Sequence, residues 1–184
     1  MDHSAPALDS LTDMQLGFDA FYRDQRAKLV ATLNAATRCG ADAATEAVDE
    51  AFVRALANWR QVGRMDAPAG YVFTVARNHL RRTKSRQATE RDLVNRRPST
   101  TVDEGRQPSW ELWDAVAELP DRERLAVALR YLGDLTERQV AEVMRIAPGT
   151  VAATLSSARK RLAALLDDAG DAGADQQEVT SHER

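Results

Sequence analysis

An arginine-rich segment is the part of this sequence whose side chains are best suited to a chemical task, the neutralisation of phosphate groups. Between Arg77 and Arg97 eight lysine or arginine residues stand against two acidic ones, although the whole chain carries a net charge of −3. Both ends of the chain are acidic, with five aspartates in residues 1–24 and six acidic side chains in residues 167–184. Because phosphate binding needs a local excess of positive charge, the segregation predicts a strip that faces nucleic acid.

The residue types that carry catalysis or bind metals form no recognisable set. His3, His79 and His182 lie far apart, Cys39 is the only cysteine, and no glycine-rich phosphate loop of the G-x-x-x-x-G-K-S/T or G-x-G-x-x-G type occurs. We therefore expect no enzyme, no metal and no cofactor. The sequence has neither an apolar run of about 18 to 20 residues nor a secretory leader, and we expect a cytoplasmic protein without membrane insertion.

The elements that position the basic segment are predicted to be helices, and the composition favours an all-α protein. One helix spans Phe18 to Leu33, a second starts near Asp42, and a third runs from about Ala69 into the basic residues. The apolar stripes expected to face inward are Val48, Ala51, Phe52, Ala55, Leu56 and Trp59 in the second helix and Val72, Val75, Ala76 and Leu80 in the third. Residues 61–68 are expected to form a loop.

Residues 93–108 contain two prolines and a glycine without any hydrophobic period, which predicts an extended linker between two small helical domains. The next helix starts near Ser109, places Leu112, Val116 and Leu119 inward and ends at Pro120. The helix after it opens at Asp121 and stops at Gly133, for which a positive φ is expected.

A helix-turn-helix pattern follows. Thr136 and Gln139 fit a capping box, so a short helix is expected from Glu137, followed by a break over residues 145–147 and a longer helix from Pro148. Such a pair of helices can present its second helix to the major groove of DNA. Along that helix a single buried stripe is expected, made of Val151, Leu155, Ala158, Leu162 and Leu165.

Three segments in this order resemble the bacterial sigma-70 family, specifically its extracytoplasmic-function (ECF) group: EAVDEAFVRALANW, APAGYVFTVARNHLRR and LPDRERLAVALRYLGDLTERQVAEVMRIAPGTVAATLSSARKRL. The resemblance covers about residues 15–166. It implies a transcription initiation factor with sigma region 2 over residues 12–92, the linker over 93–108 and sigma region 4 over 109–167. Residues 168–184 are expected to form an acidic, disordered tail.

The resemblance also implies partners and their binding residues. The partners are core RNA polymerase, through its β′ clamp and β flap, promoter DNA, and an anti-sigma factor of the kind that holds many relatives inactive. The polymerase-binding residues are Glu46, Asp49, Glu50 and Arg54. The residues that bind and open the minus-10 element are Arg64, Arg77, Asn78, His79, Arg81, Arg82 and Lys84. The residues that bind the minus-35 element are Arg138, Arg145, Thr150, Thr154, Ser156, Ser157, Arg159 and Lys160.

The second helix of the helix-turn-helix departs from the family pattern. Ala152, Thr154 and Ser157 are uncharged where relatives commonly carry Lys or Arg, and Arg145 replaces a usual glycine at a position where positive φ would cost on the order of 1 kcal/mol. Either minus-35 binding is weak, or the helix contacts thymine methyl groups through Ala152 and Ala153. The alternative function is a sigma-like adaptor that binds polymerase or another regulator with weak or absent minus-35 readout.

Overall fold

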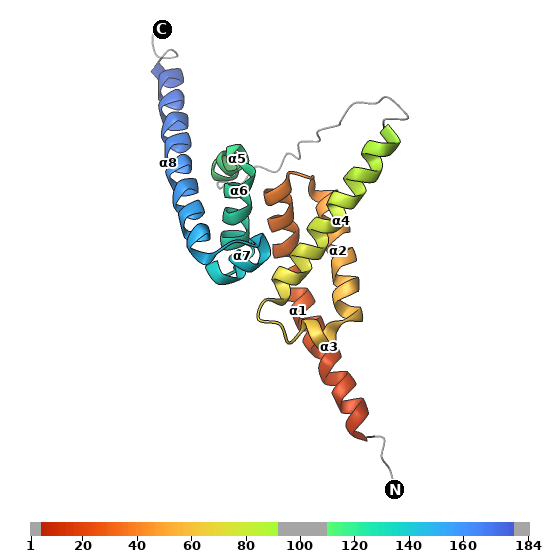
Figure 1. The fold of residues 1–184 in the computed structure, drawn as a ribbon. Coiled ribbons are helices and arrows are strands. Elements are labelled where there is room, and N and C mark those ends of the chain that lie inside the picture. The colour runs from red at the N-terminus through yellow and green to blue at the C-terminus, as the bar shows by residue number, and fades with distance from the viewer. Residues whose placement is uncertain (1–4, 92–109, 179–184) are drawn as a thin grey trace.

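The protein is built from helices, and the computed structural model describes residues 5–91 and 110–178 (Figure 1). No strand occurs within these two ranges, which confirms the predicted all-α class. The helices are α1 (Ala5–Thr37), α2 (Ala41–Ala57), α3 (Trp59–Val62), α4 (Pro68–Arg91), α5 (Trp110–Glu118), α6 (Asp121–Val127), the π-helix η1 (Ala128–Leu132), α7 (Glu137–Met144) and α8 (Pro148–Glu178). The predicted linker, residues 93–108, lies outside the described residues, as does Ser109.

Helices α1 to α4 form the N-terminal bundle, which packs α2 against both α1 and α4. An aromatic cluster closes one end of its core, where the rings of Phe18, Phe21 and Tyr22 contact Phe52 and Trp59. The expected inward stripes are largely confirmed, but Leu56 is 52% exposed and Val75 is only half-buried. The helix α3 was not predicted. It begins at Trp59, which was assigned to the second helix, and includes Gln61 and Val62, which were assigned to the loop; Val62 is buried.

Helices α5 to α8 and η1 form the C-terminal bundle, whose core contains Val116, Leu119, Leu129, Val140 and Val151. Leu112 was expected to face inward, but it is exposed because α5 packs through Ala115, Val116 and Leu119 instead. The stripe of α8 is buried only from Val151 to Ala158, and Leu162 and Leu165 are half-buried. Helix α8 continues to Glu178, and so extends into the segment 168–184 for which the sequence predicted a disordered tail.

Gly133 ends η1 for a different reason from the one expected. Its φ is −76°, and the positive φ of this turn belongs to Asp134, at 51°. A Cβ atom at Gly133 would lie 2.8 Å from the carbonyl oxygen of Leu129, which is closer than real Cβ contacts allow. Glycine is therefore needed here for close backbone approach rather than for its freedom in φ.

The two bundles pack side by side. Helix α1 contacts α6 and η1, helix α4 contacts α7, and the buried residues of both bundles form one continuous cluster. The basic end of α4 and the far end of α8 both project away from this contact (Figure 1). Within the described residues, no helix combines the length and the apolar character that crossing a membrane would require.

Candidate nucleic-acid interface

The basic half of α4 carries a concentration of exposed positive charge. Arg81, Arg82 and Lys84 are exposed, and no acidic side chain among the described residues pairs with them. Asn78 is exposed one turn earlier, and His79 is half-buried. The helix keeps these groups together toward its projecting end, where they can reach a phosphate backbone.

Arg77, one turn before Arg81, has a different environment. It lines an open cleft of about 410 Å³ between the bundles, together with Asp121, Arg122, Leu125, Met144 and Ile146. Burial lowers the pKa of the Arg77 guanidinium from its ordinary value, and the charge of Arg81 lowers it further. Arg77 was grouped with the other minus-10 residues by sequence, but the structure directs it toward the C-terminal bundle.

The loop between α3 and α4 also meets the C-terminal bundle. Arg64 and Met65 are exposed, whereas Asp66 accepts a hydrogen bond from Arg138 Nη2 of α7 at 2.6 Å. The Nε2 atom of Gln139 donates to the backbone oxygen of Asp66 at 3.0 Å. The residue Arg138, expected to bind the minus-35 element, is thus engaged by the loop expected to bind the minus-10 element.

The acidic face of α2 is only partly free. Glu46 is exposed, but Asp49 accepts two hydrogen bonds of 2.7 Å from Arg26 of α1, and Glu50 pairs with Arg54 at 2.8 Å. Val53, 64% exposed, and Leu56 lie in the same stretch of helix. Sequence periodicity assigned Leu56 to the core and left Val53 unassigned, so it missed an apolar component of this surface.

The helix-turn-helix geometry is confirmed at its two diagnostic positions. Thr136 and Gln139 form the predicted capping box at the start of α7. Arg145 ends α7 with φ 55° and ψ 50°, the left-handed conformation expected for this position. Ala141 is buried in the bundle, as expected of a small residue between packed helices, and α7 packs against α8.

The exposed start of α8 offers few groups to DNA. Ala152 and Ala153 are exposed, and Thr150 is exposed beside them. The hydroxyl of Thr154 donates to the carbonyl oxygen of Thr150 at 2.7 Å, so the hydroxyl proton of Thr154 is engaged within the helix and does not point to DNA. Arg159 and Lys160 are exposed farther along the helix, and Ser156 is half-buried.

Glu123 of α6 engages two further side chains of α8. Its carboxylate accepts a hydrogen bond of 2.8 Å from the Ser157 hydroxyl and pairs with Arg161 Nε at 3.1 Å. The Glu123 side chain is only 12% exposed, so this pairing anchors α8 to α6. The sequence analysis missed Glu123 because its partners lie 34 and 38 positions away.

Comparisons with known proteins agree with this geometry. Residues 109–162 match the family model described as "Sigma-70, region 4". An uncharacterized protein of Rhizobium meliloti (strain 1021) is 27% identical over 138 residues, which cover 67% of this chain and 33% of that protein. The chain thus spans about a third of the length of this relative.

A solved structure has a similar fold. It is a co-crystal structure of the sigma factor RpoE with the anti-sigma factor NepR from Bartonella quintana. The TM-score is 0.61 at 21% sequence identity, and the match covers 86% of this chain and 97% of that one.

Proposed function

We propose that this chain is a member of the sigma-70 family, in its extracytoplasmic-function group, and that it binds core RNA polymerase and directs transcription initiation at specific promoters. In this function the protein acts by binding rather than by catalysis. The observation that carries the proposal is the match of residues 109–162 to sigma-70 region 4. The same chain also contains the N-terminal bundle, whose helix α4 exposes basic side chains. The anti-sigma partner of the similar structure supports an anti-sigma factor as a further partner here.

Polymerase docking is assigned to α2. Its exposed polar residue Glu46, the Glu50–Arg54 pair and the exposed Val53 and Leu56 form one surface, called here the α2 face. A rigid helix that combines charged groups with exposed apolar side chains is a suitable binding surface, because the apolar part supplies affinity and the charges supply specificity. Asp49 contributes indirectly, since its pairing with Arg26 fixes α2 against α1.

Promoter opening is assigned to α4. Capture of an unstacked base costs a few kcal/mol, and positive charge along the separated strand offsets that cost. Arg81, Arg82 and Lys84 supply this charge, and Asn78 can donate and accept hydrogen bonds at a base edge. The minus-35 element is assigned to the start of α8, with Arg138, Arg145, Thr150, Arg159 and Lys160 around it.

The direct test is in vitro transcription. The protein is added to sigma-free core polymerase on a library of genomic fragments, and the 5′ ends of the transcripts are mapped. Discrete start sites that share a common upstream sequence are expected. Transcription no different from that of core enzyme alone would contradict the proposed function.

Replacement of Val53 by aspartate is expected to weaken the binding of core polymerase about tenfold. The new charge would be desolvated in the centre of the α2 face, and the loss of one well-placed apolar contact costs on the order of 1 to 2 kcal/mol. Leu16→Asp is the matched control, because Leu16 is 59% exposed on α1 at a distance in sequence from α2. Fluorescence titration with labelled protein measures both, and equal affinities for the two variants would exclude Val53 from the docking surface.

A second candidate function is favoured by the start of α8. With Ala152 and Ala153 exposed and the hydroxyl protons of Thr154 and Ser157 engaged internally, this surface supports an adaptor that binds polymerase with weak or absent minus-35 readout. Promoter choice would then depend on the N-terminal bundle or on another bound protein. The adaptor predicts complex formation with core polymerase without promoter-specific opening.

The substitution Ala152→Lys is expected to strengthen binding to duplex DNA. One new phosphate contact should raise affinity roughly three- to tenfold at low salt and steepen the dependence of log affinity on log salt by about 0.9. Ala164→Lys, which adds the same charge at an exposed position farther along α8, provides the control. Gel-shift titrations at several salt concentrations measure both quantities, and an identical response of the two variants would show that the start of α8 does not face DNA.

A further inference from the structure

The open cleft beside Arg77 has no role in the function proposed above. Its volume is about 410 Å³, and we call it the interbundle cleft. Helix α4 contributes Arg77, whereas α6, the end of α7 and the turn after α7 contribute Asp121, Arg122, Leu125, Met144 and Ile146. A smaller hollow of about 190 Å³ shares Arg77, Asp121 and Leu125 with it. The interbundle cleft therefore has the size of a small-molecule site, which is commonly about 300 to 1,000 Å³.

Arg77 brings a positive charge to this cleft that nothing compensates. Its side chain is half-buried, and none of the ion pairs between described side chains includes it. Burial lowers the pKa of the Arg77 guanidinium, and the charge of Arg81 lowers it further, because both disfavour the charged form. The guanidinium nevertheless stays protonated in a protein. An anion bound beside Arg77 would offset both unfavourable effects.

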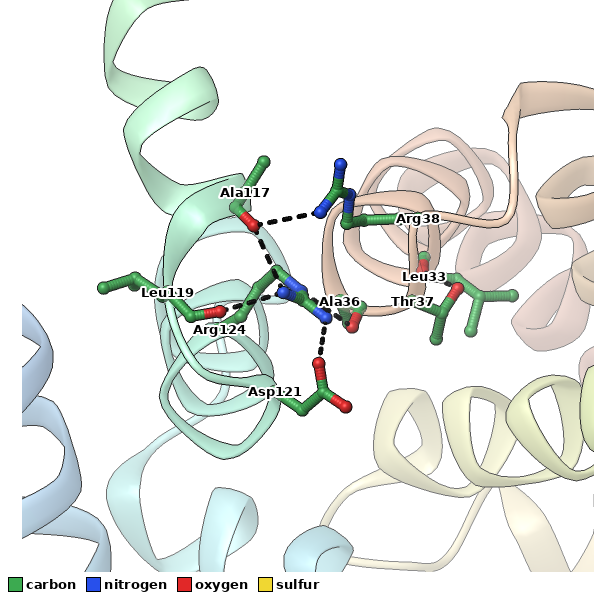
Figure 2. A network of polar contacts seen from close by, with 8 residues as sticks. All are labelled: Leu33, Ala36, Thr37, Arg38, Ala117, Leu119, Asp121 and Arg124. Carbon is green, nitrogen blue, oxygen red and sulfur yellow. Dashed lines mark hydrogen bonds and ion pairs between the residues drawn. The ribbon is translucent and has the colours of Figure 1, made fainter. Parts of the chain in front are cut away.

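The carboxylate in the lining of the cleft does not supply that anion. Asp121 pairs with Nη2 of Arg124 at 2.5 Å, so these two charges offset each other (Figure 2). Arg122, the neighbour of Asp121, is exposed and has no ion pair with any side chain that the structure describes. The lining thus holds two guanidiniums without a counter-charge, and forked guanidinium donors match the oxygen atoms of a phosphate group.

The rest of the lining is apolar. Leu125 is 7% exposed, and Met144 and Ile146 are half-buried; together they form what we call the apolar wall. The unbranched side chain of methionine adapts to apolar groups of different shapes. An inorganic anion would leave this wall uncovered, whereas a ligand with an apolar part and an anionic group would contact both parts of the cleft.

We propose that the interbundle cleft binds a small organic phosphate monoester. Its phosphate lies with Arg77 and Arg122, and its apolar part lies against the apolar wall. A phosphate monoester carries a charge of about −1.5 to −2 at neutral pH, which matches two guanidiniums better than the single charge of a carboxylate does. The site goes beyond the proposed function and is measured on the free protein, without polymerase or promoter, so that each can fail without the other.

Titrations of the isotope-labelled full chain, followed by nuclear magnetic resonance, test the site with phenyl phosphate as the probe. Inorganic phosphate lacks the apolar ring, and benzoate carries the ring with a single charge. We expect phenyl phosphate to bind at least about fivefold more tightly than either, with chemical-shift changes concentrated at the residues that line the cleft. No binding of phenyl phosphate below about 10 mM, or an affinity no higher than that of inorganic phosphate or benzoate, would overturn the proposal.

Two variants remove the charges that hold the phosphate. Arg77→Met and Arg122→Met are each expected to weaken the binding of phenyl phosphate about tenfold, because each loses a charge-assisted contact. Arg60→Met is the matched control, since Arg60 is exposed on α3 and lines neither hollow. Arg122 is exposed, so its replacement decides the test even if Arg77→Met does not fold. An affinity of Arg122→Met equal to that of the control would overturn the proposal.

The substitution Met144→Gln tests the apolar wall. Glutamine keeps the length of the side chain but makes its end polar. The affinity for phenyl phosphate should fall at least about threefold, whereas that for inorganic phosphate should stay unchanged. An unchanged affinity for phenyl phosphate, or an equal loss for both ligands, would show that the apolar part of the probe does not contact the wall, and would overturn the assignment of an organic ligand.

A backbone phosphate of DNA is the other possible occupant of the cleft. A single-stranded oligonucleotide of random sequence, titrated in the same way, distinguishes it from a small ligand. We expect Arg77→Met to lower the affinity for the oligonucleotide no more than Arg60→Met does, because both remove one positive charge. A larger loss in Arg77→Met, together with no binding of phenyl phosphate to the wild type, would assign the cleft to DNA and overturn the proposal.

Discussion

The double variant Arg81→Ala and Arg82→Ala is expected to lose about 100-fold or more of promoter opening while its affinity for core polymerase stays unchanged. Both guanidiniums are exposed on α4, and none of the ion pairs between described side chains involves them, so their removal is not expected to disturb the N-terminal bundle. A hydrogen bond to a charged group contributes about 1.5 to 3 kcal/mol, and the loss of two such contacts to phosphate corresponds to this fold-change.

The measurement is permanganate reactivity of thymines in the promoter bubble, with the variant bound to core polymerase at saturation. Arg23→Ala combined with Lys28→Ala removes the same charge from α1, where Arg23 and Lys28 contact their own helix. This control should open promoters normally. A bubble of wild-type extent in the α4 variant, or an equal defect in the control, would remove α4 from the melting step.

A large loss of stability is expected from Arg124→Met, about 2 to 4 kcal/mol in the free energy of unfolding. Arg124 is 8% exposed and donates to the carbonyl oxygens of Ala117 and Leu119, at the end of α5, as well as to Asp121 and Ala36 (Figure 2). Methionine preserves much of the volume but leaves these carbonyls without a partner. Each buried, unsatisfied group costs about 1 to 3 kcal/mol.

Urea unfolding followed by circular dichroism measures this loss, with Arg122→Met as the control because Arg122 is exposed on the same helix. The control should change the midpoint little. If both variants unfolded at the same urea concentration as the wild type, the hydrogen bonds of Arg124 would contribute nothing net to the fold.

Much of the fold could be predicted from the sequence, because it depends on local signals. The spacing of Val48, Phe52 and Ala55 identifies the buried side of α2, and the capping box at Thr136 fixes the start of α7 within one residue. Periodicity describes an apolar stripe but not what covers its edges. Leu56 and Leu112 extend such stripes and nevertheless are exposed, since no helix within residues 5–91 or 110–178 buries them.

The candidate site could be predicted only as a set of residue types. Asp49 with Arg26, Asp66 with Arg138 and Ser157 with Glu123 are pairs separated by 23, 72 and 34 positions. No local pattern indicates such pairs, because they depend on how the bundles pack. The roles assigned to these side chains toward DNA and polymerase remain predictions.

The continuity of α8 has a consequence for electrostatic screening. A helix rises about 1.5 Å per residue, so the backbone at Asp171 and Asp175 stands about 30 Å or more along the axis from Thr150. At physiological ionic strength the field of a surface charge decays over about 8 Å. The negative end of the helix is therefore too remote to repel DNA from its other end, and removal of these aspartates should leave the potential at Thr150 unchanged.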